Sequence, residues 1–231
     1  MKLFILNSLK IFFILTILAG CATDYSKGTY LLQKGQYDQA IAYFDKAIDL
    51  NPKHSDAYNN RGLAYLYNAQ HDKAISDFSK AIEINPNDAY AYNNRGDAFA
   101  IKGHFNKAIA DYDQTIEINP NNPKAYNTRE YVRVIINVEN YALLLKEKGR
   151  DTEAGVMEEQ AESLYRSLKS TESSYYLGFI PSEVLREYAI LLREEGEREN
   201  VDEIDKLADW WDQSQRKAVE QLHEELNKDK K

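Results

Sequence analysis

The five residues Tyr-Asn-Asn-Arg-Gly at positions 58–62 recur unchanged at positions 92–96. A weaker copy, Tyr-Asn-Thr-Arg-Glu, follows at positions 126–130, so the block returns each time after 34 residues. A fixed period of this length is the signature of a repeat architecture, in which each repeat forms one supersecondary unit. The period therefore decides the fold, and the rest of the chain can be placed relative to it.

A second pattern lies between these blocks and keeps the same period. Its apolar residues are spaced by three and four positions, which places their side chains on one face of a helix. They are Ala40, Ile41, Phe44, Ala47 and Ile48, then Ala74, Ile75, Phe78, Ala81 and Ile82, then Ala108, Ile109, Tyr112, Thr115 and Ile116. Each stretch ends at an Asn-Pro pair, because proline lacks the N–H that a helix interior needs and disfavours helical geometry in the residue before it. One period thus predicts two helices and two turns.

These motifs resemble the tetratricopeptide repeat (TPR) family, whose pattern contains an aromatic residue, Leu-Gly and Tyr, followed by Ala, Phe and Pro. One copy supplies Tyr58, Gly62, Tyr65, Ala74, Phe78 and Pro86, and the next supplies Tyr92, Gly96, Phe99, Gly103, Ala108, Tyr112 and Pro120. Arg61 and Arg95 stand where the family often has leucine. The resemblance implies an all-α solenoid of helix-turn-helix repeats over residues 21–122, divided at about 21–54, 55–88 and 89–122.

Residues 1–20 have the pattern of a secretory signal peptide. They carry Lys2 and Lys10 and an apolar run at 11–18, which is too short to be a spanning helix of the mature protein. The run leads into Leu-Ala-Gly-Cys at 18–21, which resembles the bacterial lipoprotein cleavage box, and Cys21 is the only cysteine of the chain. The resemblance implies that residues 1–20 are removed and that Cys21 becomes a lipidated N-terminus carrying palmitate-type acyl chains. The alternative is an ordinary signal peptide that ends near a cysteine.

The residue after the cysteine and the net charge bear on location and partners. Ala22 rather than aspartate follows Cys21, which in a host with two membranes favours sorting to the periplasmic face of the outer membrane. The formal net charge is −8 and falls to about −10 without Lys2 and Lys10. An acidic chain without a basic stripe is a poor match for nucleic acid, and a basic or neutral partner is expected instead.

The TPR resemblance implies that the first helix of each repeat lines a concave groove, where partners commonly bind. One stripe faces this groove: Asp56, Asn59, Leu63 and Leu66, then Tyr90, Asn93, Asp97 and Ala100, then Lys124, Asn127, Tyr131 and Val134, with Asn60 and Asn94 at its edge. Asparagine offers both donors and an acceptor, which suits the backbone of an extended peptide. In the alternative interpretation, the asparagines and arginines are solvated or pair between neighbouring helices.

Some family members hold the terminal carboxylate of a peptide in a two-carboxylate clamp of lysines, asparagines and an arginine. In this sequence Asn94 or Asn60 fits the middle asparagine and Lys124 fits the later lysine. Thr128 stands at the position of the clamp arginine, and Thr29 or Leu63 stands at that of the first asparagine. The clamp is incomplete, so the C-terminal tail of a chaperone is not the expected ligand.

Residues 123–231 are expected to form a helical C-terminal capping region. Glu130 replaces the glycine of the repeat, and a long helix is predicted to continue until Gly149, a typical C-terminal cap. Segment 140–149 is echoed by 187–196, which indicates worn repeats or a chance likeness between two amphipathic helices. The aromatic segment 175–179 between them is either a plug at a domain junction or an exposed contact surface. Of the adjacent Trp210 and Trp211, one is expected to pack and the other to lie at an edge.

The sequence contains no pattern that indicates catalysis. The four histidines are scattered, and there is no phosphate loop, nucleophile elbow or zinc helix motif. The pair Asp111 and Asp113 is interpreted as a solvated face, and Cys21 is assigned to the lipid. We therefore expect a protein that is not an enzyme and that has no cofactor or metal site.

Together these features predict a membrane-anchored scaffold or adaptor of the bacterial cell envelope that binds a protein or peptide in its groove. Two alternatives stay open at this level. One is a pilotin-like assembly factor for a secretin or pilus, and the other is a structural lipoprotein that self-associates, for example as a homodimer.

Overall fold

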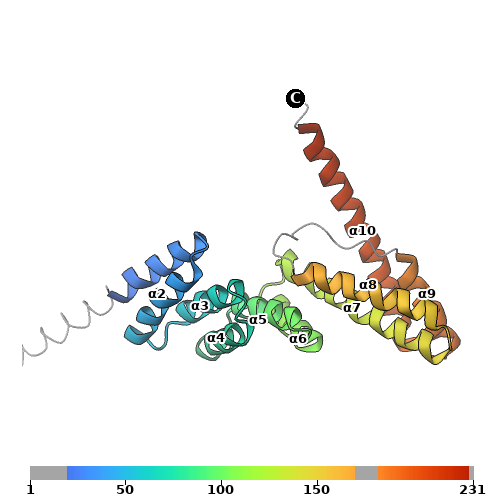
Figure 1. Ribbon diagram of the computed structural model, residues 1–231, viewed down its shortest axis with the longest axis horizontal. Coiled ribbons are helices and arrows are strands. Elements are labelled where there is room, and N and C mark those ends of the chain that lie inside the picture. The colour runs from blue at the N-terminus through green and yellow to red at the C-terminus, as the bar shows by residue number, and fades with distance from the viewer. Residues whose placement is uncertain (1–19, 170–181, 229–231) are drawn as a thin grey trace, which may run out of the picture. The chain divides into compact units, whose positions relative to one another are not determined.

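The structure is a computed structural model that describes residues 20–169 and 182–228. Within these ranges the regular structure is α-helical, and the chain divides into two compact units, Met1–Tyr126 and Asn127–Lys231 (Figure 1). The expected all-α architecture of helix-turn-helix repeats is confirmed.

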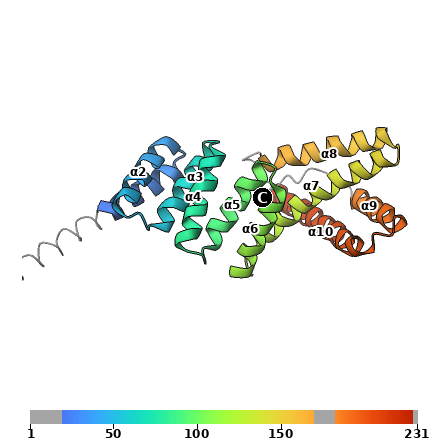
Figure 2. The same cartoon turned by 90° about the horizontal axis from the view of Figure 1, so that it is seen from below.

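Unit 1 consists of helices that pair in chain order. A helix over residues 20–33 precedes α2 (Tyr37–Leu50), and then follow α3 (Ser55–Tyr67), α4 (His71–Ile84), α5 (Ala89–Ile101), α6 (Phe105–Ile118) and the first turn of α7 (Pro123–Glu147). Each of α2 to α5 packs on the next helix in the sequence, and α3 also contacts α5 (Figure 2). We call the helix over 20–33, α3 and α5 the A helices, and we call α2, α4 and α6 the B helices.

The A and B helices of a pair approach closely because the A helix carries a glycine opposite an aromatic ring. A Cβ atom added to Gly28, Gly62 or Gly96 would lie 2.7, 2.6 or 2.8 Å from the ring of Phe44, Phe78 or Tyr112, respectively. These distances are shorter than ordinary carbon contacts of about 3.5–4.0 Å. The three rings are fully buried, so the glycine is a condition of the packing. Glu130 at the next equivalent position ends this geometry.

The Asn-Pro pairs end the B helices in a uniform way. The backbone N–H of Asn51, Asn85 and Asn119 donates to a carbonyl oxygen of the last helical turn, with φ between −130° and −138°. Each asparagine side chain also accepts a hydrogen bond from the backbone N–H two residues later, at 3.1–3.3 Å. This local bond stabilises the turn that proline then fixes.

Unit 2 is a bundle formed by the remainder of α7, α8 (Asp151–Lys169), α9 (Ser182–Glu194) and α10 (Arg198–Lys228). Aromatic contacts join its helices: Tyr131 stacks on Trp211 with ring centroids 5.9 Å apart, and Tyr141 lies 5.4 Å from Tyr188. Trp211 is buried and Trp210 is half-buried, which confirms the expected division between these neighbours.

The echoed segments 140–149 and 187–196 adopt the same local structure. Gly149 has φ +73° and Gly196 has φ +85°, and each backbone N–H donates to the carbonyl oxygen three residues earlier. The next residue donates five residues back in both cases, at 2.9 and 3.0 Å. α7 and α8 are thus connected in the same way as α9 and α10. The predicted cap at Gly149 is confirmed.

Residues 1–19 of the predicted signal segment 1–20, and the aromatic segment 175–179, lie outside the described residues. In the described part of the chain, none of the helices has a stretch with the length and hydropathy needed to cross a membrane.

Candidate functional site

The predicted groove residues fall into three classes of exposure. Asp56, Tyr90, Lys124 and Asn127 are exposed; Asn60, Leu63, Asn94 and Asp97 are half-buried; Asn59, Asn93 and Tyr131 are buried. Those in unit 1 define what we call the A-helix face. Asn127 and Tyr131 belong to unit 2, and the Tyr131 hydroxyl donates to the carbonyl oxygen of Leu164 at 3.1 Å. The placement of Tyr131 in the groove is therefore wrong, because its side chain faces the core of unit 2.

The asparagines of the repeated block bind to the neighbouring A helix. Asn94 Nδ2 donates to Asn59 Oδ1 at 3.0 Å, and Asn60 Nδ2 donates to the hydroxyl of Tyr25 at 3.0 Å. Each bond joins residues 35 positions apart, so the repeat period itself brings donor and acceptor together. For these three asparagines the structure favours pairing between helices over direct contact with a ligand.

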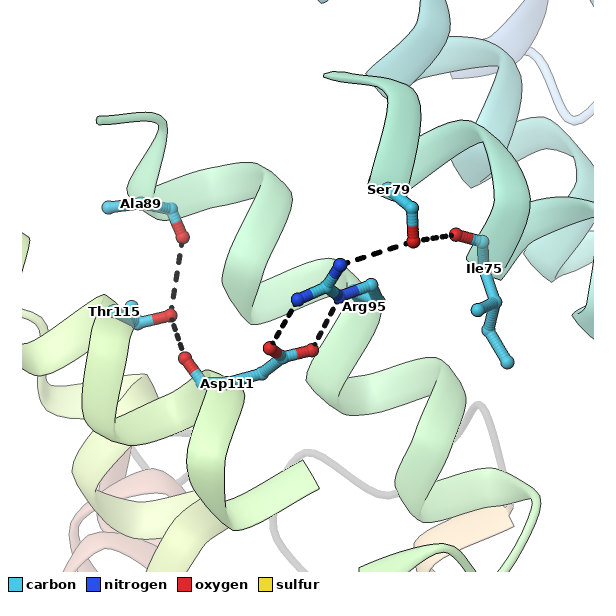
Figure 3. A network of polar contacts seen from close by, with 6 residues as sticks. All are labelled: Ile75, Ser79, Ala89, Arg95, Asp111 and Thr115. Carbon is cyan, nitrogen blue, oxygen red and sulfur yellow. Dashed lines mark hydrogen bonds and ion pairs between the residues drawn. The ribbon is translucent and has the colours of Figure 1, made fainter. Parts of the chain in front are cut away.

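The arginines that replace leucine connect three helices each. Arg95 binds both carboxylate oxygens of Asp111, at 2.8 and 2.7 Å, and donates to Ser79 Oγ at 3.1 Å (Figure 3). Arg61 binds Asp77 in the same bidentate way, with both distances 2.7 Å, and donates to Asp45 at 2.6 Å. Bidentate arginine–carboxylate pairs fix geometry as well as charge. An arginine of an A helix thus joins its own B helix to the B helix before it.

This network corrects the interpretation of Asp111 as a solvated carboxylate, since Asp111 is buried beneath Arg95. Thr115 Oγ1 extends the network, donating to the Asp111 carbonyl oxygen at 2.9 Å and lying 3.4 Å from that of Ala89 (Figure 3). The hydrogen bonds to Asp111, together with the charge of that carboxylate, raise the pKa of Arg95 above its ordinary value. The sequence signal for this ion pair was the separation of 16 residues between Arg95 and Asp111, which equals the separation between the packing glycine of an A helix and the aromatic ring that it contacts.

A second polar cluster gathers around Asp97 on the A-helix face. Asp97 Oδ1 accepts from the Tyr112 hydroxyl at 2.9 Å, and Oδ2 accepts from Asn93 Nδ2 at 3.2 Å and from Lys124 Nζ at 2.9 Å. Asn93 is 4% exposed, and its buried Oδ1 has no hydrogen-bond partner within the described residues. We call Asn93, Asp97, Tyr112 and Lys124 the Asp97 cluster.

The charges of the Asp97 cluster influence one another. Burial raises the pKa of Tyr112 well above its ordinary value, and the negative charge of Asp97 adds to this. Partial burial lowers the pKa of Lys124, but the Asp97 carboxylate outweighs this effect and the net direction is upward. Tyr112 stays a neutral donor and Lys124 stays a cation over the physiological pH range.

Sequence reasoning missed Tyr112 as a site residue because its position belongs to the core face of a B helix. The sister repeats have Phe44 and Phe78 at this position, so only the third repeat adds a hydroxyl. The same repeat is the only one with an acid at the position of Asp97, where the others have Thr29 and Leu63. The sequence signal for this site was that an acid at position 97 and a hydroxyl at position 112 appear together in one repeat.

Cys21 lies in the core of unit 1. It is 5% exposed, packs with Ala47, Ile48 and Ala57, and its Sγ donates to the Ala47 carbonyl oxygen at 3.4 Å. Burial, with a smaller effect of Asp24, raises the pKa of its thiol. Over residues 20–169 and 182–228, histidine, cysteine and acidic side chains do not form a group of three that could hold a metal ion.

Comparison with known proteins identifies the repeats. Two family models described as tetratricopeptide repeat match residues 25–89 and 89–122. A curated relative, an uncharacterised protein of Methanocaldococcus jannaschii, is 48% identical over 40 residues, which are 17% of this chain and 46% of that protein. The chain thus spans less than half the length of this relative.

Solved structures show the same architecture. The first TPR of Spaghetti (RPAP3) bound to the HSP90 peptide SRMEEVD is 28% identical with a TM-score of 0.50, covering 51% of this chain and 94% of that one. The Arabidopsis OM64 TPR domain is 26% identical with a TM-score of 0.50, covering 51% and 97%. The P58(IPK) TPR domain, 20% identical with a TM-score of 0.57, covers 81% of this chain and 50% of its own, and shows likeness of fold alone.

Proposed function

We propose that the tetratricopeptide repeats of residues 25–122 bind a segment of a partner protein on the A-helix face, and that the chain is a lipid-anchored scaffold of the bacterial cell envelope. The observation that carries the first part is Tyr90, whose side chain is 72% exposed on α5. It lies one helical turn before Asn93 and so borders the Asp97 cluster. A large exposed aromatic beside ordered polar groups is typical of the anchor residues of protein interfaces.

The partner segment proposed for this chain differs in charge from the acidic peptide that is bound to the RPAP3 repeat. Lys124 is the lysine that a terminal carboxylate would need here, and its ammonium group is already paired with Asp97. Thr128 stands at the position of the clamp arginine and supplies no positive charge, and Thr29 or Leu63 stands at that of the first asparagine and supplies no amide. The A-helix face therefore favours a segment that is not acidic.

The anchor rests on the sequence of residues 1–21 and on Cys21 as the single cysteine. In an acylated chain the thioether sulfur must leave its contact with the Ala47 carbonyl oxygen, because acyl chains cannot be accommodated among Ala47, Ile48 and Ala57. Cleavage before Cys21 also removes Gly20, so the first helical turn loses the bond from Thr23 Oγ1 to the Gly20 carbonyl oxygen. Metabolic labelling with a palmitate analogue tests this: Cys21→Ala should lose the label, and a variant that keeps it would contradict the anchor.

Affinity capture from envelope extract with the full chain tests the binding surface. Tyr90→Ala should lose a partner that the wild type captures. Tyr30→Ala should retain it, because Tyr30 is 57% exposed but lies off the groove stripe. Asn59 is unsuitable for such a test, since its removal would leave the Asn94 donor without its acceptor and change stability as well. Equal capture by Tyr90→Ala and the wild type would contradict the proposed surface.

A further inference from the structure

We propose that the Asp97 cluster is a receptor for a cationic side chain of the partner segment, with arginine as the best fit, and that Lys124 occupies this receptor in the free protein. The inference rests on the proposed function and names the chemistry of the partner at one position. It follows from the geometry of the acceptors, from the character of the Lys124 contact and from the charge of the face.

Hydrogen bonds from α5 and α6 hold the carboxylate of the cluster in place. Tyr112 donates to Asp97 Oδ1 and Asn93 Nδ2 donates to Oδ2, so the carboxylate is held from two sides. The same contact places the Asn93 amide beside the carboxylate, and within the described residues its Oδ1 is an acceptor without a donor. A buried acceptor without a donor is costly in the free protein, and a ligand that supplies the missing donor gains from it.

Lys124 satisfies only part of this arrangement. Its side chain is 64% exposed, and its ammonium group binds Asp97 Oδ2 at 2.9 Å, while Asn93 Oδ1 has no partner in the part of the chain that the structure describes. Because the lysine end of this ion pair is exposed, the pair is weaker than a buried one, and a ligand that supplies more donors can displace the lysine. A guanidinium group has five N–H donors in a planar fork and can serve a carboxylate and a neighbouring carbonyl together.

The charge and the aromatic ring near the Asp97 cluster also favour a cationic ligand. Asp56 on α3 adds an exposed carboxylate to the half-buried Asp97 on the A-helix face, and the chain as a whole carries a formal net charge of −8. The exposed ring of Tyr90 lies one turn from Asn93, and guanidinium groups stack favourably on such rings. Acid and hydroxyl coincide only in the third repeat, where Asp97 pairs with Tyr112, so the cluster is a local addition to the repeat.

Peptides that differ at one residue provide the test. The probes are the acetylated and amidated heptapeptide Gly-Ser-Gly-Arg-Gly-Ser-Gly and its versions with citrulline or glutamate in place of arginine. Citrulline has the shape of arginine without its charge. Binding to the isotopically labelled full chain in detergent is followed by the NMR signals of the Asn93 side-chain amide and of Tyr90.

We expect the arginine peptide to bind about tenfold more tightly than the citrulline peptide, the order expected for charge-assisted hydrogen bonds. Lys124→Gln should strengthen binding of the arginine peptide, because the competing ammonium group is gone. Asp97→Asn, which keeps an oxygen acceptor for Tyr112, should remove the difference between arginine and citrulline. Asp56→Asn is the matched control and should keep most of the difference.

The failures are distinguishable. If arginine and citrulline peptides shift the same signals with equal affinity, the face binds peptides but the cation receptor is wrong. Tightest binding of the glutamate peptide, or a Lys124→Gln variant that binds the arginine peptide no better than the wild type, also overturns the receptor. If none of the peptides shifts Asn93 or Tyr90, both the receptor and the proposed binding surface are contradicted.

Discussion

Ala69 occupies a backbone position that the other repeats give to glycine, and replacing it with glycine should stabilise unit 1. Its φ is +56°, and the equivalent residues Gly35 and Gly103 have φ +70° and +77°. All three turns make the same two bonds: this residue donates three positions back at 2.9–3.1 Å, and the next residue donates five positions back at 2.8–2.9 Å. The turns therefore differ chiefly in the presence of one Cβ atom.

The magnitude follows from two opposing effects. A left-handed conformation costs a residue with a Cβ roughly 1–2 kcal/mol. Glycine loses more conformational freedom on folding, which returns roughly 0.5–1 kcal/mol of that gain. Ala69→Gly should therefore stabilise unit 1 by about 0.5–1 kcal/mol, and for a unit of about 100 residues this raises Tm by roughly 2–8 °C.

Gly103→Ala supplies the matched inverse, because it adds the Cβ to a turn with the same bonds. Thermal unfolding followed by far-ultraviolet circular dichroism should show a rise in Tm for Ala69→Gly and a similar fall for Gly103→Ala. The double variant should melt close to the wild type, because separated sites act additively. A fall in Tm for Ala69→Gly would refute the reasoning, as would a rise for Gly103→Ala.

Two further predictions concern packing and pH. Gly62→Ala should destabilise the protein by about 2 kcal/mol net, because the added Cβ would lie 2.6 Å from the Phe78 ring and this overpacking exceeds the helix gain of alanine. Gly155→Ala, which has open space around it, should instead stabilise the protein by about 0.5–1 kcal/mol. Changes of the same sign in the free energy of urea unfolding for the two variants would contradict this. Burial and the charge of Glu187 raise the pKa of Tyr141 to about 12, above its ordinary value of about 10. A pKa raised by folding means that the protonated Tyr141 stabilises the folded state; this contribution is complete below a pH of about 10 and is lost as the pH rises towards 12. Tyr141→Phe should therefore lose less stability over that window in urea unfolding, and an unchanged pH profile would contradict the assignment.

The repeat period predicted the helices of unit 1 because each period carries its own start, packing face and stop. Gly62 and Phe78 are the family's packing positions, and the structure shows the physical contact between them. The extrapolation failed at Tyr131, where Glu130 had already replaced the glycine that lets an A helix approach its ring. The 34-residue spacing can be extended beyond the last repeat in the sequence, but the helix packing that it reflects has already ended at Glu130.

The candidate site was only partly visible in the sequence. Asp97 and Lys124 could be placed on the A-helix face from helix geometry, but their ion pair joins residues 27 positions apart in different helices. The sequence alone suggests a solvated face for Asp111 and Asp113, whereas in the structure Arg95, 16 residues earlier and in another helix, binds Asp111. Patterns within one helix cannot reveal bonds that depend on how two helices pack.

The measurement that tests the central claim most directly is photo-crosslinking in the native cells. The photoreactive residue p-benzoylphenylalanine replaces Tyr90, which keeps an aromatic ring on the A-helix face. In a matched chain it replaces Leu50, which is exposed at the end of α2, a B helix. The account predicts a discrete adduct with a partner protein from position 90 and none from position 50. Adducts of the same size from both positions, or from position 50 alone, would contradict binding on the A-helix face.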